Sequence, residues 1–413
     1  MIMSVVKRFV KNNPFLFATM KKGLLYVRYA QSLFETSPYK GLQKKNFLDV
    51  VEIKKKGHHC YFGYYDKSPI NLSGTKVAYL DVLDNVKPGY SADVCVFDLN
   101  TGKCKVIGHT TAWNWQQGCM VQWVNDTQVS YNKYNNESNS YVTVIVDVED
   151  SAAVREINRS AYFFNSSHTK YLSLNFFRLD IYAKGYGYPY QVDSMEWNKD
   201  GIWEVNVESN TSKLILSLER VVNYRPKDYL KLQHYINHVA YTPDEKSIIF
   251  IHRWQVKGGE FVSRLLLYHL DTDVLETLLD YGHVSHYCWK NAETLFIYAT
   301  NEKNMKGYME VNIVTKKVRM IEGLPDEDGH PSFSQDRKII LTDTYPNKGR
   351  KQYVFLFDTT KCSLYVLDTL WSPFRYFNEN RCDLHPRWSY DNKYICVDNT
   401  ASGFRSLKLY RVK

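Results

Sequence analysis

The chain has 413 residues, of which 15% are aromatic, and it contains only 20 Gly and 12 Pro, with no long linker or low-complexity tract. This composition favours one large domain over two. The formal net charge of +9 comes from bases spread along the chain, whereas a nucleic-acid-binding protein is expected to concentrate them in a stripe with aromatic platforms. The charge therefore argues against nucleic acid and suits an acidic polymer of lower charge density, such as a polysaccharide that contains uronic acids.

Residues 1–45 form a basic and aromatic extension, which contains no acidic residue before Glu35. Basic residues interrupt its apolar runs, and no stretch of the chain is long enough to span a bilayer, so we expect a cytoplasmic protein without a secretory signal. Two alternatives are predicted for residues 1–35: contact with the anionic inner face of a membrane, or a helix packed across one face of the domain.

Residues 46–413 are interpreted as seven repeats of a short β unit. In the strongest repeats, an aromatic residue is followed three positions later by an acidic residue and five positions later by lysine, as at 241–246, 333–338 and 388–393. Each reads as a strand, a polar turn and a return strand rich in Ile, Tyr and Val. Weaker copies occupy residues 66–80 with 94–107, 121–148, and 161–174 with 203–218.

The marker aromatics Tyr241, Trp289, Phe333 and Trp388 are spaced by 48, 44 and 55 residues, which is close to the roughly 40–50 residues expected for each four-stranded propeller blade. The last unit has room for only three strands, so residues 47–53 are predicted to pair with it and to cover its open edge. The predicted fold is an all-β, seven-bladed β-propeller closed by an N-terminal strand, with a short helical N-terminal extension.

Four consecutive units contain the segment His-x-x-aromatic. The histidines are His238, His286, His330 and His385. The inner strand of a propeller blade begins at the rim of the central channel, so the four imidazoles are expected to line one mouth of that channel. Imidazoles that converge from adjacent blades bind a divalent metal or transfer protons near neutral pH. The alternative is that each histidine bonds to a neighbouring blade and only ties the blades together.

Two loops are predicted to precede inner strands on the same face as the histidines. Residues 58–67 contain His59 and Tyr65, and residues 113–118 contain Gln117. These loops offer the aromatic surfaces and amide donors that sugar binding requires. They are therefore candidate substrate-binding loops.

Arginine pairs with a carboxylate through two parallel hydrogen bonds, so an acidic substrate favours arginine in the site. The candidates are Arg178, Arg253, Arg381 and Arg387. Arg387 lies two residues after His385 and would share its face on a strand. It is the leading candidate to bind a substrate carboxylate.

Other catalytic classes lack support in the sequence. There is no Gly-x-Ser-x-Gly elbow, no Walker loop and no dinucleotide fingerprint. The acidic triplet at 326–328, next to His330, is interpreted as a solvated turn rather than as a cation or glycosidase site. The histidine segments therefore remain the leading indication of chemistry.

Three short segments resemble the oligogalacturonate lyases: Gly-His-Pro-Ser-Phe-Ser at 329–334, Leu-Thr-Asp-Thr-Tyr-Pro at 341–346, and His-Pro-Arg-Trp-Ser at 385–389, with Asn237 and His238 earlier. The likeness extends over about residues 57–413 as a repeat pattern. It implies a seven-bladed propeller that holds a manganese-type ion over its channel with several histidines and a glutamine. It also implies cleavage of α-1,4-linked galacturonate by β-elimination.

The resemblance implies a role for each histidine. By position, His238 is the catalytic base, and His286, His330 and His385 form the metal-binding cluster. The expected cofactor is a divalent metal, with manganese favoured over zinc or calcium. Near the last histidine the family has a glutamine and a further histidine. In the same region this chain offers Cys382 and Arg387 instead.

β-Elimination requires that the carboxylate of a uronate be neutralised, that a base remove the C5 proton, and that an acid protonate the leaving oxygen. We assign the carboxylate to Arg387 and the metal, the base to His238, and the acid to water or Tyr65. The other expected substrate contacts are His59, Gln117, Arg178 and Arg253.

The predicted function is that of a lyase acting on an oligo- or polysaccharide that contains uronic acids. Two alternatives belong to other classes. One is a non-catalytic propeller that binds an acidic glycan in a surface-polysaccharide assembly system. The other is a protein-interaction scaffold in which the histidines are structural.

Overall fold

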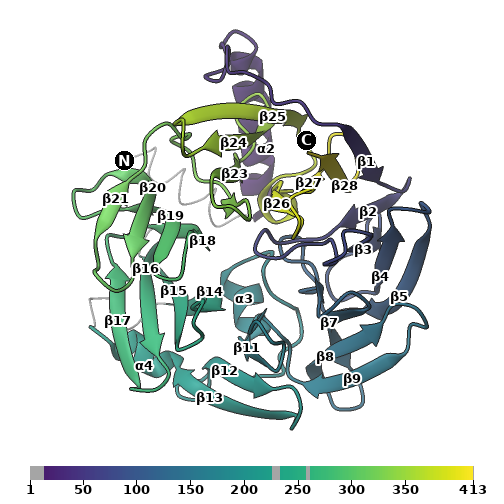
Figure 1. The fold of residues 1–413 in the computed structure, drawn as a ribbon, viewed down its shortest axis with the longest axis vertical. Helices are drawn as coiled ribbons and strands as arrows, with labels where there is room; N and C mark the ends of the chain where they lie inside the picture. The colour runs from purple at the N-terminus through teal and green to yellow at the C-terminus, as the bar shows by residue number, and fades with distance from the viewer. Residues whose placement is uncertain (1–13, 226–232, 257–260, 413) are drawn as a thin grey trace.

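The chain folds into seven four-stranded antiparallel sheets arranged as blades around a central axis (Figure 1). The computed structural model describes residues 14–225, 233–256 and 261–412. Residues 1–13 of the predicted N-terminal extension lie outside this part. The architecture is a seven-bladed β-propeller, which confirms the predicted fold.

The first three blades contain none of the four histidines His238, His286, His330 and His385. The first contains β2 (His58–Tyr61), β3 (Lys76–Leu83), β4 (Ala92–Asp98) and β5 (Cys104–Thr110). The second contains β6 (Gln122–Trp123), β7 (Gln128–Asn135), β8 (Ser140–Asp147) and β9 (Ala153–Asn158). The third contains β10 (Phe163–Phe164), β11 (Lys170–Ser173), β12 (Gly201–Asn206) and β13 (Thr211–Ser217). The inner strand of the first blade thus starts at His58, within the segment that was predicted to be a loop before it.

The other four blades contain the histidine segments. The fourth contains β14 (His234–Tyr241), β15 (Ser247–Gln255), β16 (Phe261–His269) and β17 (Val274–Leu279). The fifth contains β18 (Val284–Trp289), β19 (Thr294–Thr300), β20 (Lys306–Asn312) and β21 (Val318–Met320). The sixth contains β22 (Ser332–Phe333), β23 (Ile339–Asp343), β24 (Lys351–Asp358) and β25 (Ser363–Trp371). The seventh contains β26 (Arg387–Trp388), β27 (Tyr394–Asn399), β28 (Ser406–Arg411) and β1 (Asp49–Ile53).

The acidic residue that marks the strongest repeats closes the turn between the first two strands of a blade. In the seventh blade, Asp391 Oδ1 accepts hydrogen bonds from Ser389 Oγ (2.7 Å) and from the main-chain N–H of Lys393 (3.1 Å). Asn392 between them has φ 57°, a left-handed conformation that asparagine tolerates. The same bonds recur in the fourth and sixth blades. The repeated Asp therefore fixes a turn, and the lysine contributes its main-chain N–H.

The ring is closed by pairing between the two ends of the propeller sequence. β1 runs antiparallel to β28, with Asp49 opposite Arg411 and Ile53 opposite Leu407. Figure 1 shows the dark purple β1 beside the yellow β28. The N-terminal strand supplies the fourth strand of the last blade, as predicted from the shortage of strands there.

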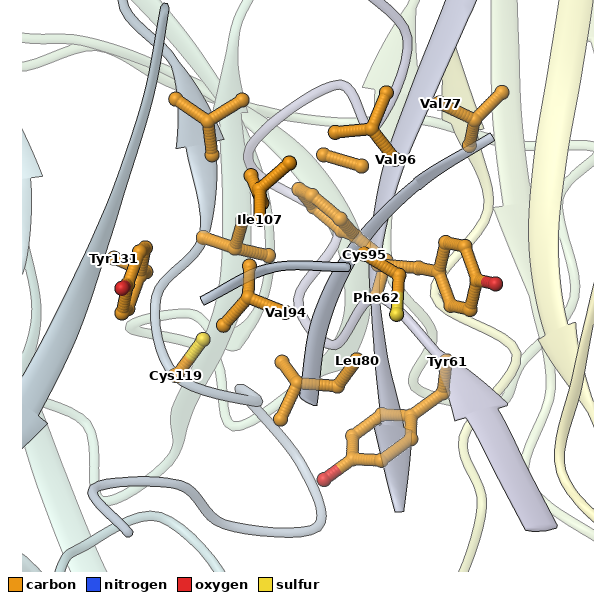
Figure 2. Close-up of a cluster of buried hydrophobic side chains, with 14 of the residues drawn as sticks. Tyr61, Phe62, Val77, Leu80, Val94, Cys95, Val96, Ile107, Cys119 and Tyr131 are labelled. Carbon is orange, nitrogen blue, oxygen red and sulfur yellow. The ribbon is translucent and has the colours of Figure 1, made fainter. Parts of the chain in front are cut away.

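The core consists of apolar residues packed between neighbouring blades. Figure 2 shows Tyr131 of the second blade opposite Val94 and Ile107 of the first. A Cβ atom added at Gly108 would lie 2.1 Å from the Tyr131 hydroxyl, so only glycine fits there. Burying one such large side chain stabilises the fold by about 1.5–3 kcal/mol.

Helices occur outside the blades. α3 (Phe176–Tyr182) follows β11, α4 (Leu218–Asn223) follows β13, and a 3₁₀ turn, η1 (Asn378–Asn380), lies between β25 and β26. Asn175 caps α3 by accepting the Arg178 main-chain N–H at 3.0 Å. These insertions lie between strands and bring additional side chains to the end of the ring where the inner strands begin.

α2 (Pro14–Ser32) packs on the propeller through its second half. The ring of Tyr26 stacks on Phe374 at 4.4 Å, and Tyr29 meets the same ring edge-on at 5.1 Å. Met20, Leu24 and Val27 remain exposed. No helix among the described residues is long and apolar enough to cross a membrane. The segment therefore packs across part of the propeller and still presents an apolar stripe.

Candidate functional site

The inner strands are irregular where the histidines occur. The pairing of β14 with β15 shifts register around His238, and that of β18 with β19 shifts around His286. His238 has φ 50° and His385 has φ 44°, which is unusual for a residue with a side chain. Bulges and left-handed residues redirect a side chain out of the alternation of a strand, and they are common next to functional sites.

The structure brings the four histidines together in the channel. The ring centroids of His238 and His286 are 5.3 Å apart, those of His286 and His330 are 4.1 Å apart, and those of His330 and His385 are 4.3 Å apart. Each residue is at most 6% exposed. The cluster is therefore a row of buried imidazoles from four consecutive blades.

Two tyrosines from the loop after β2 pack against this row. The ring of Tyr64 lies 5.0 Å from that of His385, and its hydroxyl lies 2.8 Å from His238 Nδ1. The Tyr65 hydroxyl donates to the carbonyl of Tyr287 and accepts its main-chain N–H, both at 2.9 Å. Tyr65 is thus close to the cluster, but its hydroxyl is occupied by the inner strand of the fifth blade.

Two buried aspartates orient the imidazoles. Asp343 accepts from His330 Nδ1 at 2.9 Å, and it also accepts the main-chain N–H groups of His330 at 2.7 Å and His385 at 3.2 Å. Asp328 lies 3.2 Å from His286 Nδ1. An Nδ1 that donates to a carboxylate leaves the Nε2 lone pair of the neutral ring free for a ligand.

One group of ligand atoms has the spacing of a metal site. His330, Asp383 and His385 each offer an atom, and these atoms lie within 4.8 Å of one another. Within the described part of the chain, Nε2 of His330 and Nε2 of His385 have no hydrogen-bond partner, although both are buried. Two imidazole nitrogens and a carboxylate oxygen are a donor set that Mn²⁺ and Zn²⁺ accept.

A partly exposed rim surrounds the cluster. Arg381 pairs with Asp383 through both carboxylate oxygens, at 2.5 and 2.7 Å, and its guanidinium lies 4.5 Å from the centre of the Tyr345 ring. Tyr345 in turn lies 5.7 Å from His330. Arg253 donates to Asn237 Oδ1 at 3.1 Å. The rim thus carries two guanidinium groups and a tyrosine hydroxyl next to the metal-type ligands His330, Asp383 and His385.

The four histidines differ in the direction in which their surroundings shift the pKa. Burial lowers the pKa of His238 and of His385 well below the usual value, and neighbouring positive charge lowers both further. Burial also lowers the pKa of His286. Burial has the same effect on His330, but the charge and hydrogen bond of Asp343 outweigh it and the pKa is raised. The neutral ring is therefore favoured at His238, His286 and His385, whereas His330 would have to release a proton in order to bind a metal.

Asp328 belongs to the site and not to a solvated turn, which corrects the interpretation of the acidic triplet at 326–328. Burial raises its pKa, but the charge and hydrogen bond of His286 outweigh burial and bring the pKa to about 2. Glu327 accepts a hydrogen bond from Tyr39. The main-chain carbonyl of Asp326 accepts a hydrogen bond from the Tyr298 hydroxyl at 2.7 Å, so the triplet is tied into the protein at all three positions.

Arg387 and Arg178 are placed away from the open side of the cluster. Arg387 is 1% exposed, pairs with Asp398 at 2.7 Å, and donates to the carbonyls of Tyr64 and Gly63. Arg178 is buried against Asp200 at the side of α3. Both guanidinium groups are paired within the fold and are at most 5% exposed, so neither is open to a substrate. Arg381 differs from them because its side chain is 32% exposed although it pairs with Asp383.

Gln117 and His59 lie at different distances from the cluster. Gln117 Nε2 donates to the Tyr162 hydroxyl at 3.1 Å, and that hydroxyl accepts the main-chain N–H of His238 at 3.0 Å. His59 instead lines a separate cavity with Trp115 and Arg375. Gln117 therefore supports the cluster through Tyr162, whereas His59 lies in the wall of the separate cavity.

Sequence reasoning missed three acidic residues of this site. Asp383 lies two residues before His385, and Asp343 lies at the end of β23 in the segment that carried the family resemblance. Asp328 was assigned to solvent. The available signal was an aspartate two residues before His330 and another two residues before His385. Aspartates are also frequent in turns, so this signal is weak.

The fold and the histidine cluster together define a class, a seven-bladed propeller with potential metal ligands in its channel. No family model matches the sequence, and no curated protein matches it either. Among solved structures, oligogalacturonate lyase from Vibrio parahaemolyticus is similar at 12% identity and a TM-score of 0.62, covering 90% of this chain and 99% of that one. An oligogalacturonate lyase in complex with manganese is similar at 14% identity and a TM-score of 0.63, with the same coverage.

A propeller from another class of protein is also similar. The β-propeller domain of the Trilobed protease from Pyrococcus furiosus is 12% identical, with a TM-score of 0.50, covering 85% of this chain and 95% of that domain. At these identities the comparisons show a shared fold. The chemistry must be argued from the residues of the site.

Proposed function

We propose that this chain is a metal-dependent lyase that cleaves an oligo- or polysaccharide containing uronic acids by β-elimination. The observation that carries the proposal is the group of ligand atoms from His330, Asp383 and His385 within 4.8 Å of one another. The Nε2 atoms of both histidines lack a hydrogen-bond partner in the described part of the chain. A buried polar atom without a partner is costly, and a bound cation relieves that cost.

The donor set and its support fit a divalent metal. His330 donates to Asp343 through Nδ1, as metal-binding histidines commonly do to a carboxylate. His286 lies next to the group and would complete the ligand set suggested by the family resemblance. Manganese is the favoured ion, since one structurally similar lyase is described in complex with it. When bound, the metal would neutralise the uronate carboxylate and make the C5 proton more acidic.

His238 is the proposed base. Burial keeps its imidazole neutral, so it has a lone pair with which to take the C5 proton. Its ring stands beside the metal-type ligands, 5.3 Å from His286. Tyr64 holds the ring through a hydrogen bond at 2.8 Å. The proton would therefore leave the substrate toward the fourth blade, away from Asp383.

The rim supplies the residues for the other two requirements of β-elimination, which are neutralising the substrate carboxylate and protonating the leaving oxygen. Arg253 and Arg381 are the arginines that we assign to binding the substrate carboxylate. They replace Arg387 in this role. Burial raises the pKa of Tyr345 well above its usual value, so its hydroxyl stays protonated and can protonate the leaving oxygen. Tyr345 is better suited to this role than Tyr65, whose hydroxyl is bonded to the main chain.

The test combines metal content with product formation. Purified protein is assayed for bound metal and then mixed with galacturonate, glucuronate and mannuronate polymers, with and without chelator. We expect a chelator-sensitive rise in the ultraviolet absorbance of 4,5-unsaturated uronate. A metal-loaded protein that gives no such product with any polymer would exclude the lyase.

A second function, binding of an acidic glycan without cleavage, is favoured by one observation. All four histidines are at most 6% exposed, so a sugar reaches them only if the rim moves. Glycan affinity that is unchanged in His238→Ala and His385→Ala, with no product from the wild type, would support this function over the lyase.

Membrane contact by α2 is a separate proposal about partners. Met20, Leu24 and Val27 form an exposed apolar stripe one helical turn apart, and basic residues lie beside it. Sedimentation with anionic and zwitterionic vesicles tests it. We expect binding to anionic vesicles that Leu24→Asp abolishes, whereas equal binding of the variant would reject the stripe as the contact.

A further inference from the structure

A second cavity, of about 660 Å³, lies beside the histidine cluster. Its walls come from the loop between β3 and β4, the loop between β5 and β6, the loop after α3, and the loop between β25 and β26. The last of these loops also carries Asp383. The cavity and the cluster are therefore built partly from the same segment.

One residue, Gln116, connects the two. Gln116 donates its main-chain N–H to the carbonyl of Gly185 at 3.2 Å and its Nε2 to the carbonyl of Arg381 at 2.8 Å. Gly185 and Asn380 line the cavity, while Arg381 pairs with Asp383 of the cluster. Gln116 thus links a segment that lines the cavity to the segment that carries Asp383, so the cavity and the cluster are neighbours in the fold.

A hydrogen-bonded relay holds one arginine at the cavity. His59 Nδ1 accepts the main-chain N–H of Arg405 at 3.2 Å, so the ring proton is on Nε2, which donates to Asp84 at 2.9 Å. Asp84 also pairs with Arg375. The side chain of Arg375 is nevertheless 46% exposed, so part of the guanidinium is free to bind an anion. His59 is thereby a positioning residue for Arg375.

The rest of the lining suits an acidic sugar chain. Trp115 provides a partly exposed aromatic face, and Asn85 and Asn380 provide exposed amides, whereas Tyr376 and Asn114 line the cavity but are themselves buried. The cations that line it are Lys87, Lys184, Arg375 and Arg405, against the carboxylates Asp84, Asp180 and Glu379. Two of these carboxylates already have cationic partners, Asp84 with Arg375 and Asp180 with Lys184. The cavity therefore combines a stacking surface, amide donors and a small excess of positive charge.

We propose that this cavity is an extended subsite for the same acidic glycan, which makes the substrate an oligosaccharide of several residues whose distal uronate binds Arg375 and Lys184 while a sugar ring packs on Trp115. The inference rests on the proposed function for its substrate class. It goes further in assigning chain length and a second recognition point, outside the histidine cluster.

The test measures affinity against chain length. Full-length protein carrying His238→Ala, which keeps the proposed metal ligands and prevents turnover, is titrated calorimetrically with galacturonate, glucuronate and mannuronate oligomers from the dimer upward. The affinity of this parent protein is expected to rise with length. Arg375→Ala with Lys184→Ala should weaken binding of long oligomers by about ten- to a hundredfold and leave dimers unchanged. Arg319→Ala is the matched control, since Arg319 lies 69% exposed on β21 of the fifth blade.

The outcomes separate this proposal from the lyase. Length-independent affinity, an equal loss for all lengths in the double variant, or no binding of any oligomer would overturn the subsite. Length-dependent binding through Arg375 without any unsaturated product from the wild type would retain the subsite and remove the lyase. If product formation requires His385 but its rate is unchanged in the double variant, made with His238 intact, at every oligomer length, the lyase is retained and the subsite is rejected.

Discussion

One position near the first turn of each blade is occupied by histidine in four blades and by other residues in three. In every blade, the residue four places later donates its main-chain N–H across the first turn, as Asn71 does to Lys76 and Thr242 to Ser247. By this register, the positions equivalent to His238, His286, His330 and His385 are Lys67, Met120 and Ala161. Met120 has φ 56°, similar to the 50° of His238. A left-handed residue at this position therefore occurs in the second blade as well as in the fourth and seventh.

The two halves differ in their carboxylates. Asp328, Asp343 and Asp383 all lie between β21 and β26, in the part of the ring that carries His286, His330 and His385. The repeated strands provide a position that points into the channel, whereas the aspartates and loops that do not repeat determine which imidazoles are oriented and which nitrogens are free. The site is thus a local addition to a repeated frame.

The largest effect is expected from removing the metal ligands. His330→Ala or His385→Ala should reduce bound metal from about one equivalent to none, because the remaining donors are too few to hold the ion. Metal analysis of purified protein measures this. Met120→Leu, at the equivalent position of the second blade, is the control and should retain its metal. Equal metal content in all three variants would show that the two halves do not differ.

Removing the base should have a smaller and more selective effect. His238→Ala is expected to lower kcat by about 10²–10⁴-fold, while metal content and Tm change little, because His238 lies outside the metal-type group. Steady-state kinetics, metal analysis and thermal unfolding of the same preparation provide the three measurements. A large fall in Tm with unchanged kcat per folded molecule would instead identify His238 as a residue that ties blades together.

The orienting carboxylates should matter in proportion to the ligands they hold. Asp343→Asn is expected to weaken metal binding by about 10–100-fold, since Asp343 orients His330. Asp328→Asn provides the comparison, because among the four histidines Asp328 hydrogen-bonds only to His286, and its effect should be smaller. Competition with a chelator of known affinity gives both values. The reverse order would mean that His286, rather than Asp383, completes the ligand set.

The smallest effect is expected from adding a histidine to the other half. Met120→His should bind no second metal, because no oriented carboxylates accompany that position. Stability should fall by about 1–3 kcal/mol, the cost of burying a polar ring without a partner. Metal stoichiometry and urea unfolding test this. A second bound equivalent would show that the frame alone suffices to make a site.

The sequence predicted the repeated features well, and it failed where the backbone leaves the repeat. The turn aspartates, the blade spacing and the missing last strand are local patterns, and they led to the correct propeller and its closure. Arg387 was expected to share a face with His385 by strand alternation. The φ of 44° at His385 breaks that alternation, and Arg387 reaches Asp398 instead. Asp383 depends on the path of a long loop, which no periodic pattern describes.

The pairing of β1 with β28 also governs when this protein can finish folding. Asp49–Ile53 is synthesised long before its partner strand, Ser406–Arg411, and six complete blades lie between them in the sequence. During synthesis the early strand must wait, unpaired or held elsewhere, until its partner has left the ribosome. The contact has one of the largest sequence separations in the chain, so ring closure is expected to be a late and slow step. A tag or fusion that delays release of the C-terminus would therefore prolong the lifetime of the open ring.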